Sequence, residues 1–120
     1  MPVTFDNVRK IALSLESAEE GTSYGTAAFK VRGKLFLRVK EDGDSLVVRA
    51  DFEQRDALIA EDPTTYYITD HYLKYEWVLV RLSRVHPDAM RDLIRMAWRS
   101  ASAAAAKKRR SPRPRRTPRR

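Results

Sequence analysis

The sequence has no cysteine, only four glycines and no long hydrophobic run. Without cysteine, the chain cannot form a disulfide framework, a thiolate metal site or a cysteine nucleophile. The longest apolar stretches, such as residues 77–80, are far shorter than the ~20 residues of a membrane span, and the first residues lack the basic start and apolar run of a signal peptide. We therefore expect a cytoplasmic protein without a membrane partner.

Acidic residues are missing from the last part of the chain. The 120 residues include 24 basic and 16 acidic ones, a formal net charge of +8. Residues 107–120 hold nine of the basic residues, so that 15 basic and 16 acidic residues remain in residues 1–106. The terminal segment has three prolines and no hydrophobic residue, and it cannot bury apolar surface to offset the entropy of ordering. We expect a folded domain in residues 1–106 and a disordered tail in residues 107–120.

The first half of the domain combines a helix with a hairpin. Thr4 is a suitable N-cap, and apolar residues recur at helical spacing from residue 5 to residue 15. A loop around Gly21 and Gly25 is expected next. Alternating residues 29–31 and 35–39 on either side of Gly33 then predict a β-hairpin, followed by a strand over residues 45–50.

The second half continues with helices and short strands. Asp51 and Gln54 resemble a capping box, which predicts a short helix that Pro63 ends. Residues 66–68 and 77–82 are expected to be strands, and Pro87 is placed as the first residue of a last helix that frays through residues 101–106. Short turns between sequential strands predict an α+β domain: a mainly antiparallel sheet with the helices packed on one face.

Strand alternation also predicts which side chains share a face of the sheet. The residues expected to face the helices are Leu35, Leu37, Val39, Leu46, Val48, Val78, Val80 and Leu82. The opposite face would then carry Phe36, Arg38, Val47, Arg49, Trp77, Leu79 and Arg81. An open face of arginines and aromatics can stack unpaired bases and hold phosphates. Alternatively, other parts of the chain cover this face, and the usual role of large aromatics in burial favours that interpretation.

Several short motifs together resemble a known family. They are the opening helix, the segments 23–26 and 28–31, the residues Gly33-Lys34-Leu35-Phe36, the aromatic loop before Trp77 and the closing helix. Their order and spacing over residues 4–100 resemble the MmcQ/YjbR family. The resemblance implies a CyaY-like α/β fold and DNA binding, which is how the family is usually described.

Basic residues are the main candidates for a binding function. A flexible arginine-rich segment can neutralise phosphates without reading bases, which points to the tail residues Lys107, Lys108, Arg109, Arg110, Arg113, Arg115, Arg116, Arg119 and Arg120. The hairpin adds Lys30, Arg32 and Lys34, and the outer sheet face adds Arg38, Arg49 and Arg81. We therefore expect sequence-nonspecific binding to DNA, with RNA as a second polyanion, and association with the nucleoid if the source is bacterial. A monomer is slightly favoured.

A second hypothesis assigns recognition to the aromatic segment, residues 66–77. In that case the domain binds a protein or a small ligand, and the tail only aids solubility or encounter. Asp70 and His71 in this segment are adjacent in sequence, which does not establish the oriented pair that general-base catalysis needs. Two histidines, His71 and His86, are too few and too far apart for a zinc site. We expect no enzyme activity, no cofactor and no metal.

Overall fold

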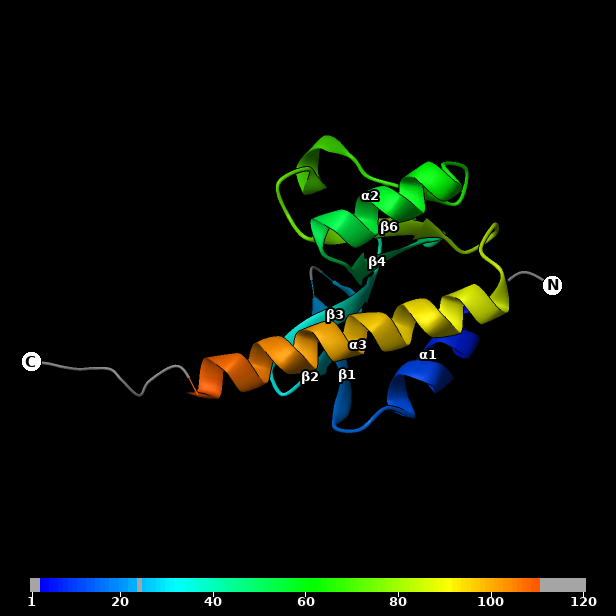
Figure 1. Cartoon of the computed structure of the whole chain (residues 1–120). Helices are drawn as coiled ribbons and strands as arrows, with labels where there is room; N and C mark the ends of the chain where they lie inside the picture. Colours follow the sequence, from blue (N-terminus) through cyan, green and yellow to red (C-terminus); the bar gives the residue numbers. More distant parts are fainter. Residues whose placement is uncertain (1–2, 24, 111–120) are drawn as a thin grey trace, which may run out of the picture.

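A computed structural model describes residues 3–23 and 25–110, except for the side chains of residues 108–110. Its elements are α1 (Phe5–Leu13), β1 (Ala18–Ser23), β2 (Thr26–Val31), β3 (Lys34–Val39), β4 (Ser45–Arg49), α2 (Phe52–Glu61), β5 (Tyr66–Tyr67), the 3-10 helix η1 (Asp70–Tyr72), β6 (Trp77–Arg81) and α3 (Pro87–Arg110). Six strands form one antiparallel sheet in the order β1-β2-β3-β4-β6-β5. The predicted α+β class with a mainly antiparallel sheet is confirmed (Figure 1).

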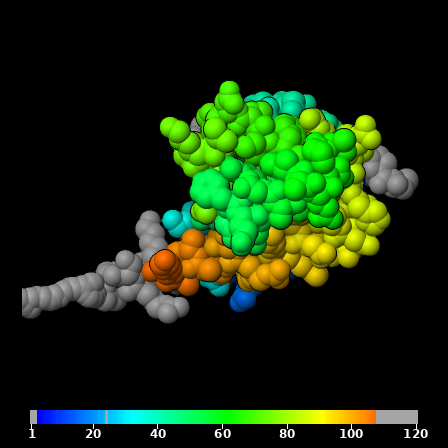
Figure 2. Space-filling model, turned by 45° about the horizontal axis from the view of Figure 1, so that its top comes forward, coloured from blue at the N-terminus to red at the C-terminus, as the bar shows by residue number. Residues whose placement is uncertain are grey.

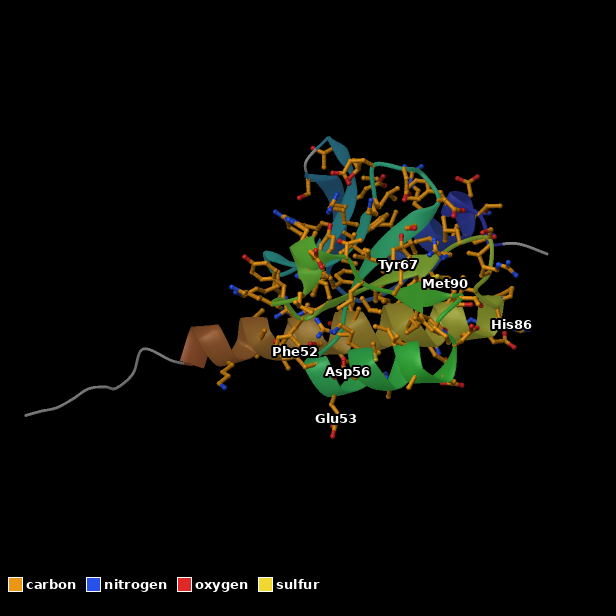
Figure 3. All side chains as sticks on the ribbon, turned by 90° about the horizontal axis from the view of Figure 1, so that it is seen from above. Phe52, Glu53, Asp56, Tyr67, His86 and Met90 are labelled. Atoms are coloured by element: carbon orange, nitrogen blue, oxygen red, sulfur yellow. The ribbon has the colours of Figure 1, made fainter. Side chains whose placement is uncertain are left out.

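The helices bury their apolar residues against one face of the sheet. In Figure 1, α3 crosses the strands with α2 above it and α1 below it, and the view from above places α2 and α3 on one side of the strands (Figure 3). The main core joins α1, α3 and the sheet, and its fully buried members include Val8, Phe29, Leu46, Val80 and Ile94. Burial of one such side chain stabilises the fold by about 1.5–3 kcal/mol. This shared core is the principal stabilising contact of the domain.

A β-bulge decides which side chains of β3 face the helices. Phe29 of β2 pairs with Leu37, whereas Lys30 pairs with Leu35, so that Phe36 is an extra residue in β3. Phe36 and Leu37 are both fully buried in the main core, and Leu35 lines a pocket on the other face. The prediction from regular alternation is therefore wrong for Leu35 and Phe36, because one inserted residue reverses the alternation.

The hairpin itself is confirmed, with a tight turn between β2 and β3. Arg32 has φ of 50° and Gly33 has φ of 84°. Two successive residues with positive φ characterise the type I′ turn, whose twist matches that of the flanking strands. Glycine adopts this conformation at little cost, whereas arginine does so less readily. The turn therefore places a strained basic residue at the tip of the hairpin.

The segment before the hairpin is a strand, not the predicted loop. β1 pairs with β2 along its whole length, from Ala18 opposite Val31 to Ser23 opposite Thr26. Its four central residues are exposed, so the sequence lacks the apolar alternation that indicates a strand. Main-chain pairing with its neighbour, rather than side-chain burial, accounts for β1.

The predicted starts of the helices are confirmed. The Thr4 side chain accepts a hydrogen bond from the backbone of Asn7, and Asp51 and Gln54 form a reciprocal capping box at the start of α2. Pro87 is the first residue of α3. At the start of α1 and of α2, a side chain accepts a hydrogen bond from a backbone N–H that has no helical partner. At the start of α3, Pro87 has no N–H to satisfy.

The end of α3 differs from the prediction. The helix continues to Arg110, so residues 107–110 are helical although they were assigned to the disordered tail. A run of alanines precedes them, and basic residues near a helix C-terminus are favoured by the helix dipole. The tail prediction for residues 111–120 lies outside the described residues.

The bulge makes a prediction about stability. Phe36→Ala should lower the free energy of unfolding by about 3–5 kcal/mol, because a fully buried ring is removed. Leu35→Ala should cost at most about 1.5 kcal/mol, because this half-buried side chain lies at the edge of a pocket. Urea denaturation of both variants measures the difference, and equal losses would contradict the bulged register.

The capping box of α2 gives a second prediction. Asp51→Ala should lower the free energy of unfolding by about 1 kcal/mol, because the backbone N–H of Gln54 loses its acceptor at 2.7 Å. Asp51→Asn is the matched control, since an asparagine oxygen caps nearly as well. Thermal denaturation of the two variants compares them, and a loss as large in the asparagine variant would show that charge rather than capping is responsible.

Candidate functional site

The outer face of the sheet, opposite the helices, is partly covered by the segment around η1. Tyr72 of η1 packs with Val47 and Leu79 in a second, smaller apolar cluster, and Tyr67 and Trp77 pack against it. This agrees with the expectation that other parts of the chain cover this face. The three arginines predicted on this face consequently lie in different surroundings.

Arg38 is enclosed beneath η1. Arg38 is only 5% exposed. One terminal nitrogen donates to the hydroxyl of Tyr72, and the other donates to Thr26 Oγ1, to the carbonyl oxygen of Val39 and to a carboxylate oxygen of Glu41, each at 3.4 Å. A buried charge needs such partners. Arg38 therefore links the sheet to η1 and is not an exposed cation.

Arg49 and Arg81 lie toward opposite ends of β4 and β6, since Arg49 pairs with Trp77 and Arg81 pairs with Ser45. The guanidinium of Arg81 is 4.1 Å from the ring centre of Tyr67, and its Nε donates to a loop carbonyl oxygen at 3.1 Å. The guanidinium of Arg49 is 6.0 Å from the ring centre of Trp77 and donates to the carbonyl oxygen of Leu35 at 3.3 Å. The structure thus does not group the three arginines into one cluster.

A pocket of about 340 Å³ opens between η1 and the outer face. It is lined by Leu35, Arg38, Val47, His71, Tyr72, Tyr75 and Trp77. Val47 and Arg38 are almost fully buried, whereas Tyr75 is 56% exposed. The pocket therefore has a buried floor and an exposed aromatic rim, with mostly apolar walls, as is typical of small-molecule sites.

A second cavity of about 380 Å³ adjoins the first and shares Arg38, His71 and Tyr72 with it. Lys40 and Glu41 also line this second cavity. A backbone hydrogen bond, followed by the attraction of Arg38, lowers the pKa of the Glu41 carboxyl below its ordinary value. Glu41 is thus charged at neutral pH, and its negative charge partly balances the positive charges of Arg38 and Lys40.

Arg55 of α2 is a site residue that the sequence analysis missed. It is buried, and its guanidinium donates to the carbonyl oxygens of Tyr72, Leu73 and Tyr75 at 3.4, 3.2 and 3.0 Å. These three bonds hold residues 70–76, here called the η1 segment, in place from the side of α2. No motif marks this role, because an arginine in an amphipathic helix normally indicates a solvated side chain.

The tip of the basic hairpin contacts α3 through Arg32. Arg32 Nη1 donates to Ser102 Oγ at 2.8 Å, which fixes the hairpin tip against the C-terminal part of the helix. In Figure 2, the cyan end of the hairpin lies next to the orange end of α3. Lys30 is exposed and stands opposite Glu19 in the register of β1 and β2. Lys34 is half-buried. The structure therefore brings the hairpin and the start of the basic segment together.

The exposed surface of α3 carries further basic residues. Arg91, Arg95, Arg99 and Lys107 are all exposed, and Arg91 forms an ion pair with Asp88 at 3.5 Å. The remaining predicted site residues of the tail, Arg113, Arg115, Arg116, Arg119 and Arg120, lie outside the described residues, as do the side chains of Lys108, Arg109 and Arg110.

Potential metal ligands are scattered over the described part of the domain. Within residues 3–23 and 25–107, no three histidine or carboxylate side chains are grouped to hold a metal ion. His71 is exposed, and its ring contacts the ring of Tyr72 edge-on, with the ring centres 4.9 Å apart. In the part of the chain that the structure describes, no helix is both long and apolar enough to cross a membrane.

The Arg55 contacts predict how η1 is held. Arg55→Met should lower the free energy of unfolding by about 2–3 kcal/mol, because three carbonyl oxygens lose a charged donor. Amide hydrogen exchange should also become faster in residues 70–76. All three bonds come from Nη1, and Arg55→Lys keeps a charged nitrogen donor on a different side chain, so its stability should lie between that of the unchanged chain and that of Arg55→Met. Unchanged exchange in the methionine variant would contradict the assigned role.

Part of the chain is similar in sequence to mycobacterial proteins that are described as uncharacterized. Uncharacterized proteins of Mycobacterium bovis and Mycobacterium tuberculosis are 40% identical to this chain over 57 residues, which cover 47% of this chain and 44% of each relative. The match therefore spans less than half the length of these relatives.

A solved structure and a family model cover more of the chain. The crystal structure of Deinococcus radiodurans protein DR2400, described as domain DUF419, superposes with a TM-score of 0.70 over 87% of this chain and 88% of that chain, at 20% sequence identity. This likeness concerns the fold. The YjbR family model matches residues 13–100. The motifs noted in the sequence and this match over most of the domain agree, and the chain belongs to the YjbR family.

Proposed function

We propose that the protein binds DNA without sequence specificity through a basic surface at the C-terminal end of α3. This hairpin–tail surface consists of Lys30, Arg32 and Lys34 together with the residues 107–120. The observation that carries the proposal is the hydrogen bond of 2.8 Å from Arg32 to Ser102. It places the basic hairpin beside the helix from which the basic segment continues.

The charge distribution supports this surface rather than the rest of the domain. Residues 1–106 have almost balanced charge, whereas residues 107–120 have nine basic residues and no acidic one. Lys107 lies five residues beyond Ser102 on α3, a rise of about 7.5 Å. The basic segment thus starts within one to two helical turns of the hairpin contact, and both can meet the same stretch of phosphates.

The proposed contacts are electrostatic. Lysine and arginine side chains displace counterions from the phosphate backbone, which produces affinity that depends strongly on salt but not on base sequence. The outer-face arginines have no part in this proposed surface, because Arg38 is 5% exposed, Arg81 packs on Tyr67 and Arg49 donates to the carbonyl oxygen of Leu35. RNA presents the same phosphate chemistry and is a second substrate to compare in the same titration.

The proposal predicts a change in salt dependence. Changing the five arginines of residues 111–120 to glutamine should reduce the slope of log K against log salt by up to about 4.5, at about 0.9 for each lost phosphate contact. K30Q/K34Q should reduce it by up to about 1.8 more. Arg32 stays unchanged because it contacts α3. Fluorescence anisotropy of a labelled duplex at several salt concentrations measures both effects.

The matched control removes five exposed basic residues elsewhere. It combines glutamine substitutions of Lys10, Lys74, Arg84, Arg91 and Arg95, all exposed in the structure. This variant has the same net charge as the five-arginine variant and should retain most of the original slope. If the control loses as much affinity as the tail variant, net charge rather than the hairpin–tail surface governs binding.

A further inference from the structure

The pocket between η1 and the outer face shares no lining residue with the hairpin–tail surface. Its floor consists of Val47 and Arg38, which are 2% and 5% exposed. Tyr72, at 9% exposure, closes one side. With a volume of about 340 Å³, the pocket is near the lower end of the range for small-molecule sites. A ligand of one or two rings fits this space, whereas a folded partner cannot reach the floor.

The walls favour a planar ligand. Trp77, Tyr72, Tyr75 and His71 supply four rings around the space, and Leu35 and Val47 supply its aliphatic surfaces. Aromatic side chains attract another ring in offset-stacked or edge-on arrangements. A flat aromatic ring can therefore stack on these rings, whereas a puckered saturated ring with the same carbon skeleton cannot stack.

Arg49 is not a lining residue of the pocket but contacts two residues that are, and it has no anionic partner among the described residues. Arg49 donates to the carbonyl oxygen of Leu35 and lies over the Trp77 ring, and both of these residues line the pocket. Its Nε is buried and has no hydrogen-bond partner among the described residues. None of the carboxylates in the described range forms an ion pair with it. Because Nε is buried, an anion can meet this guanidinium only on its exposed part, and a half-buried guanidinium without an anionic partner favours a carboxylate or phosphate group there.

The wall formed by the η1 segment is held independently of any ligand. Arg55 fixes three of its carbonyl oxygens, and Arg38 donates to the Tyr72 hydroxyl. A pocket that is already formed avoids the cost of ordering a loop on binding. The aromatic wall is thus in place before a ligand enters.

We infer that this pocket is a binding site for a small planar aromatic anion. The ring lies between Trp77 and the tyrosines of the η1 segment, and the anionic group meets Arg49. The site is separate from the hairpin–tail surface, so it does not depend on DNA binding.

Three probes separate the parts of this inference on the unchanged full chain. They are 2-naphthoate, the uncharged 2-naphthamide, and the non-planar decahydronaphthalene-2-carboxylate. The readout is the indole N–H signal of Trp77 in two-dimensional NMR spectra, with Trp98 of α3 as an internal reference outside the pocket. We expect saturable shifts of the Trp77 signal, and at least fivefold weaker binding of both the amide and the saturated acid. A response of Trp98 as large as that of Trp77, or equal binding of the three probes, would overturn the inference.

A matched pair of variants tests the anchor. Arg49→Gln should weaken 2-naphthoate binding at least tenfold and leave 2-naphthamide binding nearly unchanged. Arg81→Gln is the control, because Arg81 lies on the same face but packs on Tyr67 outside the pocket. An equal loss in both variants, or none in Arg49→Gln, would contradict the assignment of the anion to Arg49. If Arg49→Gln does not fold, the comparison of the charged and uncharged probes on the unchanged chain decides the same point.

Discussion

The β-bulge in β3 is the constraint on which both faces of the sheet depend. Because Phe36 is an extra residue opposite the Phe29–Lys30 step, two consecutive side chains of β3 enter the helical core. Leu35 and Arg38 are consequently directed to the outer face, where both line the pocket. A regular strand would place Leu35 and Arg38 on different faces. The packing of the core and the existence of the outer pocket therefore follow from the same local irregularity.

Two buried arginines organise the outer face in complementary ways. Arg38 reaches from the sheet to the hydroxyl of Tyr72, and Arg55 reaches from α2 to the carbonyl oxygens of the same segment. Charged donors of this kind form stronger hydrogen bonds than neutral ones, and leaving their partners unsatisfied in the interior is costly. The η1 segment is short and contains little regular structure, so these contacts explain how it becomes a defined wall.

The two proposed functions use different residues of the molecule. The hairpin–tail surface lies where Arg32 at the hairpin tip meets α3, and it depends on charge carried mostly by the terminal segment. The pocket belongs to the outer face and depends on shape, aromatic walls and one arginine. Because the two surfaces share no residue, a protein that binds both DNA and a small anion is physically consistent, and each property can be removed separately. Membership of the YjbR family applies to the domain, since residues 101–120 lie beyond the matched range.

The sequence by itself determined the features that depend on neighbouring residues. The caps at Thr4 and Asp51, the start of α3 at Pro87, the hairpin about Gly33 and the concentration of charge after residue 106 are all local patterns. Tertiary structure decided the rest. The strand β1 exists because β2 offers a pairing edge, the bulge exists because the core accommodates Phe36, and α3 extends four residues past the predicted end. Arg55 contacts carbonyl oxygens 17–20 residues away, and the pocket joins β3, β4 and the residues around η1, so periodicity and spacing provide no signal for either.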